Sequence, residues 1–142
     1  MKPCILPWIN FGTNTFGKPR VCGYSSQTSD EWDFNSQYFR DIRSSFLKGE
    51  WPDNCKRCRH VEELGGTSKR MDENHMWYDQ YSHLIGQEVD TPPHLDVRTG
   101  SVCNFKCIHC GPASSSRWME DYDLIRGYGF DYPIPDDKWI AQ

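Results

Sequence analysis

Seven cysteines in a chain of 142 residues restrict its fold more than any other feature of the sequence. An odd number cannot pair completely as disulfides, and the first twenty residues lack the basic start and apolar run of a secretion signal. Without export, cysteines are better explained as metal ligands. No stretch approaches the roughly 20 apolar residues that span a bilayer. We therefore expect a cytoplasmic protein with no membrane partner.

The composition indicates that metal contributes to folding. Only 26 of the 142 residues are Val, Ile, Leu or Phe, a share at which disorder becomes a serious alternative. A net charge of −4 and an aromatic content of 14% do not suit a disordered chain. Metal–ligand bonds can replace missing apolar burial in such a domain. The mildly acidic balance gives no electrostatic reason to expect nucleic acid as a partner.

The N-terminal part is predicted to hold a hairpin and helices. Residues 4–11 and 19–24 are short aromatic and β-branched runs on either side of a Gly-rich turn. A helix is expected after Asn35, a good N-cap, and is ended by Gly49 and Pro52, with Cys55 and Cys58 in the loop that follows. A further helical stretch is expected over residues 61–81, interrupted at Gly65-Gly66.

The C-terminal part begins at a predicted linker, Thr91-Pro92-Pro93. Residues 94–99 are expected to form a strand that leads into the cysteines. Ser114–Ser116 can cap a helix, and residues 136–142 resemble the start of another. The expected inner face of the first of these helices is Trp118, Tyr122 and Ile125. We expect an α+β protein: a small cysteine-rich module of hairpin and helices (residues 1–90), then the first βα unit of a partial (β/α) barrel (residues 91–142).

Three cysteines follow the predicted strand closely, as Cys103-x3-Cys107-x2-Cys110. We call residues 103–110 the cysteine loop. Three thiolates on one short loop can bind three corners of a four-iron cluster, because thiolate is the ligand such clusters prefer. The fourth iron then keeps an open position, as catalytic metal sites do. A structural zinc with His109 or a distant residue as fourth ligand is the alternative, although zinc sites more often use two separated pairs.

At these residues the chain resembles the radical S-adenosylmethionine superfamily. The resemblance implies that a [4Fe-4S] cluster on Cys103, Cys107 and Cys110 binds the methionine moiety of S-adenosylmethionine through its open iron. One electron, from a reductant such as ferredoxin or flavodoxin, would then cleave the cofactor to a 5′-deoxyadenosyl radical. His109 stands where the family usually has an aromatic residue beside the adenine. The Gly111-Pro112 pair is also common in one branch of the superfamily.

The other four cysteines can satisfy a closed metal site. We call Cys4, Cys22, Cys55 and Cys58 the N-terminal cysteine set. Their spacing alone does not separate zinc from an iron–sulfur cluster, and by itself favours zinc as the commoner closed site.

A second resemblance concerns this set. Twelve residues separate Cys4 from Gly17, which opens Gly-x4-Cys22. This resembles the auxiliary-cluster module called SPASM, or its shortened form twitch, and Cys55-x2-Cys58 fits the shortened form. The module usually follows the radical domain, whereas here it precedes it, as in some enzymes of bacteria and their phages. The resemblance implies an auxiliary [4Fe-4S] cluster for electron transfer or substrate positioning. A purely structural role is equally open.

The sequence after Cys110 is short for a radical S-adenosylmethionine core, which is a partial barrel of several strand–helix units. We expect a longer enzyme cut by a truncated reading frame, or a split protein completed by a second chain. The 142 residues alone are expected to be inactive. The resemblance implies a radical enzyme with two [4Fe-4S] clusters and S-adenosylmethionine. Its substrate is unknown, and analogy with enzymes that carry auxiliary modules suggests a peptide. The alternative is a non-catalytic zinc or iron–sulfur module.

Overall fold

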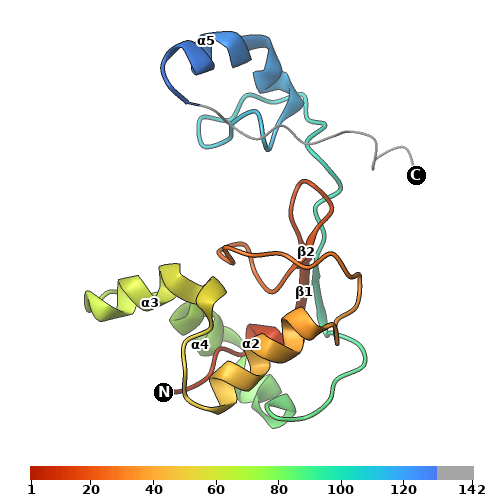
Figure 1. The fold of residues 1–142 in the computed structure, drawn as a ribbon, viewed down its shortest axis with the longest axis vertical. Helices are drawn as coiled ribbons and strands as arrows, with labels where there is room; N and C mark the ends of the chain where they lie inside the picture. Colours follow the sequence, from red (N-terminus) through yellow and green to blue (C-terminus); the bar gives the residue numbers. More distant parts are fainter. Residues whose placement is uncertain (131–142) are drawn as a thin grey trace. The chain divides into compact units, whose positions relative to one another are not determined.

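The computed structural model describes residues 1–130, which form an α+β protein of two compact units (Figure 1). The first unit comprises Met1–Thr13 and Lys18–Val97, and the second Asn14–Gly17 and the residues from Arg98 onward. The α-helices are α1 (Leu6–Ile9), α2 (Gln37–Leu47), α3 (Lys56–Glu63), α4 (Lys69–Tyr81) and α5 (Tyr122–Gly127). The 3₁₀ helices are η1 (Asp53–Cys55), η2 (Ser82–Leu84) and η3 (Ser116–Asp121), and the strands are β1 (Asn10–Thr13), β2 (Pro19–Arg20) and β3 (His94–Asp96).

The sheet has the order β2-β1-β3. β1 pairs antiparallel with β2, with Gly12 opposite Arg20, so the predicted hairpin is confirmed. Its first strand is shorter than expected, because Leu6–Ile9 form a single helical turn that has a proline at its start. A side chain at Gly12 would place its Cβ 3.3 Å from the Arg20 carbonyl oxygen, which explains the glycine in this strand.

β3 joins the sheet beside β1 in parallel, with Asn10 opposite His94. The sequence predicted a strand over residues 94–99, and the structure forms its first half. The expected division at residue 90 assigned this strand to the C-terminal domain. Because the strand pairs with β1, it belongs to the first of the two compact units.

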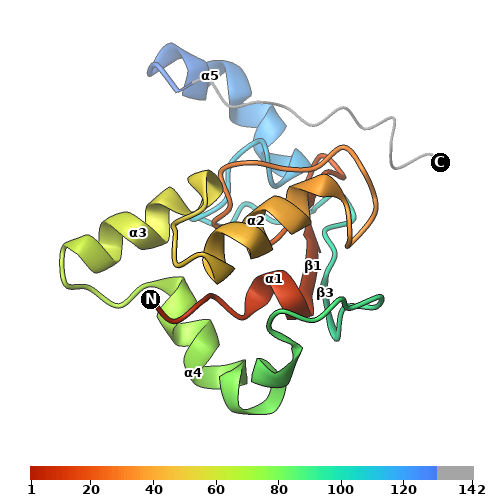
Figure 2. The ribbon, with the colours of Figure 1, turned by 60° about the horizontal axis from the view of Figure 1, so that its bottom comes forward.

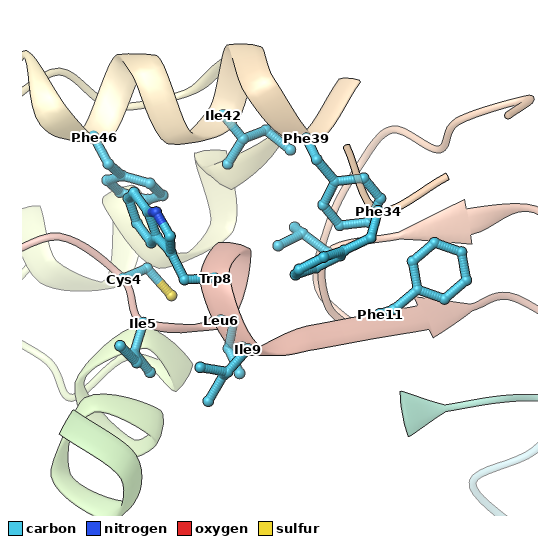
Figure 3. Packing of buried hydrophobic residues seen from close by; sticks show 11 residues of the cluster. Cys4, Ile5, Leu6, Trp8, Ile9, Phe11, Phe34, Phe39, Ile42 and Phe46 are labelled. Carbon is cyan, nitrogen blue, oxygen red and sulfur yellow. The ribbon is translucent and has the colours of Figure 1, made fainter. Parts of the chain in front are cut away.

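An aromatic core holds the first unit together (Figure 3). Trp8 and Phe39 are almost fully buried, and the Phe39 ring lies 5.6 Å from Phe11 and 5.2 Å from Phe34 between centroids. α1 contacts both α2 and α4, and Figure 2 shows α2 and α4 on opposite sides of it. Aromatic rings bury a large area each, so few residues suffice for this small core.

The helix predicted after Asn35 is confirmed as α2, with Phe39, Ile42 and Phe46 on its buried face. It ends before Gly49, whose φ of 76° is the left-handed conformation that glycine adopts readily. Ser36 rather than Asn35 occupies the N-cap position. The Asn35 side chain instead accepts a hydrogen bond from Arg43.

The interruption predicted at Gly65-Gly66 is also confirmed, since it separates α3 from α4. The placement of Cys55 and Cys58 in a loop is wrong. Cys55 ends η1, and Cys58 lies within α3, which begins five residues earlier than the predicted helical stretch. The connection between α2 and α3 is short, because η1 begins directly after Pro52 and α3 follows η1 without a gap.

The second unit has little buried surface in its described part. Trp118, Tyr122 and Ile125, the predicted inner face, are half-buried, and no side chain of residues 116–127 is fully buried. Leu124 and Tyr128 are 63% and 75% exposed. The helical start expected at residues 136–142 lies outside the described residues. None of the helices within residues 1–130 has the length and apolar character needed to cross a membrane.

We predict that Phe39→Ala lowers the free energy of unfolding by about 3–5 kcal/mol, because it removes a buried ring and leaves a cavity. Leu47→Ala, on the same helix but 56% exposed, serves as the control and should cost about 0.5 kcal/mol or less. Urea denaturation followed by tryptophan fluorescence measures both. Equal losses for the two variants would contradict the assignment of the core.

Candidate metal centre

The N-terminal cysteine set lines a single cavity, although its members come from three separate stretches of the chain. The cavity between them is small, with a volume of about 20 Å³. Apolar side chains form much of its remaining wall, among them Leu6, Val21, Phe46 and Trp51. Cys4 and Cys58 are buried, and Cys22 and Cys55 are half-buried. Figure 3 shows the Cys4 sulfur among the core side chains. The fold therefore gathers the four thiols that the sequence grouped by spacing.

α4 holds the segment that carries Cys4. The Asn74 side chain accepts a hydrogen bond from the Ile5 amide at 2.9 Å and donates one to the Pro3 carbonyl at 2.9 Å. One turn earlier, Arg70 donates to the carbonyl of Lys2. Residues four apart lie on the same face of a helix, so these two side chains fix the backbone on both sides of Cys4.

A second polar group fixes Cys22 relative to Cys55. The Tyr38 hydroxyl accepts a hydrogen bond from the Val21 amide at 3.3 Å and one from the Asn54 side chain at 3.2 Å. The Asn54 backbone carbonyl also accepts from the Ser26 amide at 3.1 Å. Asn54 is only 2% exposed, so these bonds are buried and costly to break. They tie the loop that follows Cys22 to the turn that ends at Cys55.

Burial raises the pKa of three thiols of this set. Desolvation dominates at each, raising the pKa of Cys4 well above its usual value and that of Cys55 to about 12. The pKa of Cys22 is raised for the same reason. Mutual repulsion between the thiolates adds to the effect at Cys4 and Cys55. Ionising these three thiols in the cavity therefore costs free energy, which the positive charge of a metal centre would offset.

Two cationic side chains, Lys69 and Arg70, also line the cavity at the first turn of α4. Each is paired with a carboxylate: Lys69 with Glu73, and Arg70 with Glu62. Arg70 is nine-tenths buried. Positive side chains against a group of thiols stabilise any negative charge that the group carries.

Within residues 1–130, no three His, Cys, Asp or Glu side chains are arranged closely enough to hold one metal ion. A Zn–S bond of about 2.3 Å places tetrahedral sulfur ligands only about 3.8 Å apart. The ligands of a four-iron cluster lie farther apart, because each binds a different iron. Four thiols lining one cavity are a donor set that both structural zinc and four-iron clusters use.

The cysteine loop lies in the second unit and is much more exposed. Cys107 is exposed, whereas Cys103 and Cys110 are half-buried. The residues after the loop bind its backbone: Ser115 Oγ donates to the Phe105 carbonyl at 2.7 Å, and Trp118 Nε1 to the Cys107 carbonyl at 3.3 Å.

Ser116 holds the start of the loop, since its hydroxyl accepts from the Cys103 amide at 3.1 Å and lies 3.2 Å from the Cys103 carbonyl oxygen. The backbone of the cysteine loop is thus fixed by Ser115, Ser116 and Trp118, while Cys107 remains exposed. His109, the residue expected beside adenine, is exposed.

Four residues of the candidate centre were not predicted as part of it. They are Tyr38, Asn54, Arg70 and Asn74. None belongs to a recognisable motif, and only tertiary contacts bring them to the cysteines. Glu62 lies near the end of α3 and binds Arg70.

No protein-family model, curated protein or solved structure significantly matches the chain.

We predict that Cys55 in metal-free native protein reacts with iodoacetamide at pH 8 roughly a hundredfold more slowly than in guanidinium-unfolded protein, because the thiolate is the nucleophile. Burial and a pKa of about 12 keep this thiol protonated in the folded state. Its rate should rise as the pH approaches 12. Peptide mass spectrometry measures the rate, with the exposed Cys107 as the control whose rate changes little on unfolding. Equal Cys55 rates in both states would contradict the buried cavity.

Proposed function

We propose that this chain is an iron–sulfur protein of the radical S-adenosylmethionine type, with an auxiliary [4Fe-4S] cluster on the N-terminal cysteine set. The observation that carries the proposal is the convergence of four thiols from distant segments on one cavity. Apolar walls and two cations at the first turn of α4 surround these thiols. With four protein ligands, this cluster serves electron transfer or substrate positioning.

The cysteine loop is proposed to hold the second cluster. Its three thiols leave one iron free to bind S-adenosylmethionine, and that cluster when bound supplies the electron that cleaves the cofactor. β3 precedes the loop, and η3 and α5 follow it. We propose that these elements form the first βα unit of a partial barrel, a fold whose chemistry lies at the carboxyl ends of the strands. The hydrogen bonds from Ser115, Ser116 and Trp118 hold the loop for this purpose.

Further sequence or a second chain is proposed to complete the barrel. The support is the apolar surface of the second unit, where Val102, Phe105 and Ile108 are 72%, 65% and 96% exposed. Side chains of this kind are normally covered by neighbouring strands and helices in an α/β fold. We place the protein in the cytoplasm, where reductants such as ferredoxin or flavodoxin occur and thiols stay reduced. A peptide is the substrate class we propose, by analogy with enzymes that carry auxiliary modules.

The second candidate function is a non-catalytic metal-binding module. The observation that favours it is the position of the N-terminal cysteine set beside the small aromatic core, where ligand bonds would stabilise the fold. In this case the metal, zinc or a cluster, would be structural and the cysteine loop would bind no S-adenosylmethionine.

An electron paramagnetic resonance experiment separates the two candidates. The chain is reconstituted anaerobically with iron and sulfide and reduced, and its spectrum is recorded with and without S-adenosylmethionine. We predict that S-adenosylmethionine changes the signal of one cluster, because it binds the open iron. Cys107→Ala should abolish this change, whereas Ile108→Ala, at an exposed neighbouring position, should keep it. An unchanged wild-type spectrum, with both clusters present by iron analysis, would contradict the proposed binding of S-adenosylmethionine at the cysteine loop.

A further inference from the structure

Arg70 is the most highly constrained charged side chain beside the cysteines. Its Nε and Nη2 atoms donate to the two carboxylate oxygens of Glu62 at 2.9 and 2.6 Å. Its Nη1 atom donates to the carbonyl of Lys2, and its guanidinium lies 5.3 Å from the ring of Trp51. These contacts leave the guanidinium one orientation, in the wall of the thiol cavity. A planar fork of donors held in this way fixes the position of a charge.

Stability alone does not account for an ion pair at this place. Only 10% of the Arg70 side chain and 18% of the Glu62 side chain are exposed. Removing two charges from water costs free energy that their attraction often fails to recover, and apolar replacements are frequently as stable. The charge of Arg70 also acts on the thiols, since Cys4, Cys58 and Cys55 interact electrostatically with it. The pair therefore fixes the guanidinium of Arg70 in the wall beside these thiols.

We propose that Arg70 raises the reduction potential of the cluster on the N-terminal cysteine set, and that Glu62 holds it in place and partly offsets its charge. This inference rests on the function proposed above. Accepting one electron makes the centre one charge more negative, while the four thiolates keep their charge. A cation in a low-dielectric wall stabilises this reduced form more than the oxidised form. Arg70 is thus a positioning residue for electron transfer, not a ligand.

Lys69 is a second, more exposed positive charge in the same cavity wall, with which the effect of Arg70 can be compared. It lines the same cavity, but 31% of its side chain is exposed, three times the fraction of Arg70. Water screens an exposed charge more strongly than a buried one. The effect of Lys69 on the potential is therefore weaker than that of Arg70.

The test is a redox titration with dithionite of the full chain carrying Cys103→Ala, Cys107→Ala and Cys110→Ala, so that only the N-terminal cysteine set holds a cluster. In this background Arg70→Met should lower the reduced-to-oxidised ratio at fixed potential at least tenfold, a shift of about 59 mV for one electron. Lys69→Met should shift the potential in the same direction by less. Arg40→Met, an exposed arginine of α2 away from the cysteines, should leave it unchanged.

The direction of the shift in reduction potential in Glu62→Gln separates a charge effect from a structural disturbance. This substitution removes the negative charge but keeps an oxygen that can accept from Arg70, so the potential should rise. A structural disturbance would move both variants in the same direction, and that result, or no shift in Arg70→Met, would overturn the inference. If Arg70→Met holds no cluster, a higher reduction potential in Glu62→Gln supports the inference, and a lower or unchanged potential overturns it. If the unsubstituted Arg70 protein binds zinc or no metal instead of iron and sulfide, the proposed function fails and the inference with it.

Discussion

The convergence of four thiols on one cavity is the constraint on which the first unit depends. Cys4, Cys22 and the Cys55–Cys58 stretch are far apart in the chain, so side chains outside the cysteine motifs must bring them together. Two of these side chains lie on α4: Arg70 and Asn74 bind the backbone of residues 2–5 on both sides of Cys4. Tyr38 and Asn54 do the same for Cys22 and Cys55. The aromatic core then packs against a wall of this cavity, since Phe46 belongs to both.

The two groups of cysteines differ in the way that their proposed roles require. The N-terminal cysteine set is enclosed by apolar side chains and two paired cations, a setting that favours a permanently bound centre. The cysteine loop has its backbone fixed by Ser115, Ser116 and Trp118, yet Cys107 is exposed. A site that must admit a cofactor needs an open position. Burial at one site and access at the other thus agree with an auxiliary centre and a reacting centre.

Patterns in the sequence predicted the elements that local chemistry determines. The spacing of Phe39, Ile42 and Phe46 with Gly49 behind them predicted α2, and Gly65-Gly66 predicted the break before α4. The helical turn at Leu6–Ile9 was missed, because its short run of apolar residues fits a buried strand equally well.

Long-range contacts could not be predicted, because local sequence patterns do not show which distant segments pack together. Glu62 could not be paired with Arg70, nor Asn74 with Ile5, because such bonds depend on how α3, α4 and the N-terminal segment pack. The grouping of the cysteines was accessible from spacing, whereas the charges and amides that surround them were not. The parallel pairing of β3 with β1 was missed in the same way.

The most direct test of the central claim is the iron, sulfide and zinc content of the chain after anaerobic purification and reconstitution. Two four-iron clusters predict about eight irons and eight sulfides per chain. Replacing Cys103, Cys107 and Cys110 by alanine should leave about four of each, held by the N-terminal cysteine set. One or two zinc ions per chain with no sulfide would contradict the account.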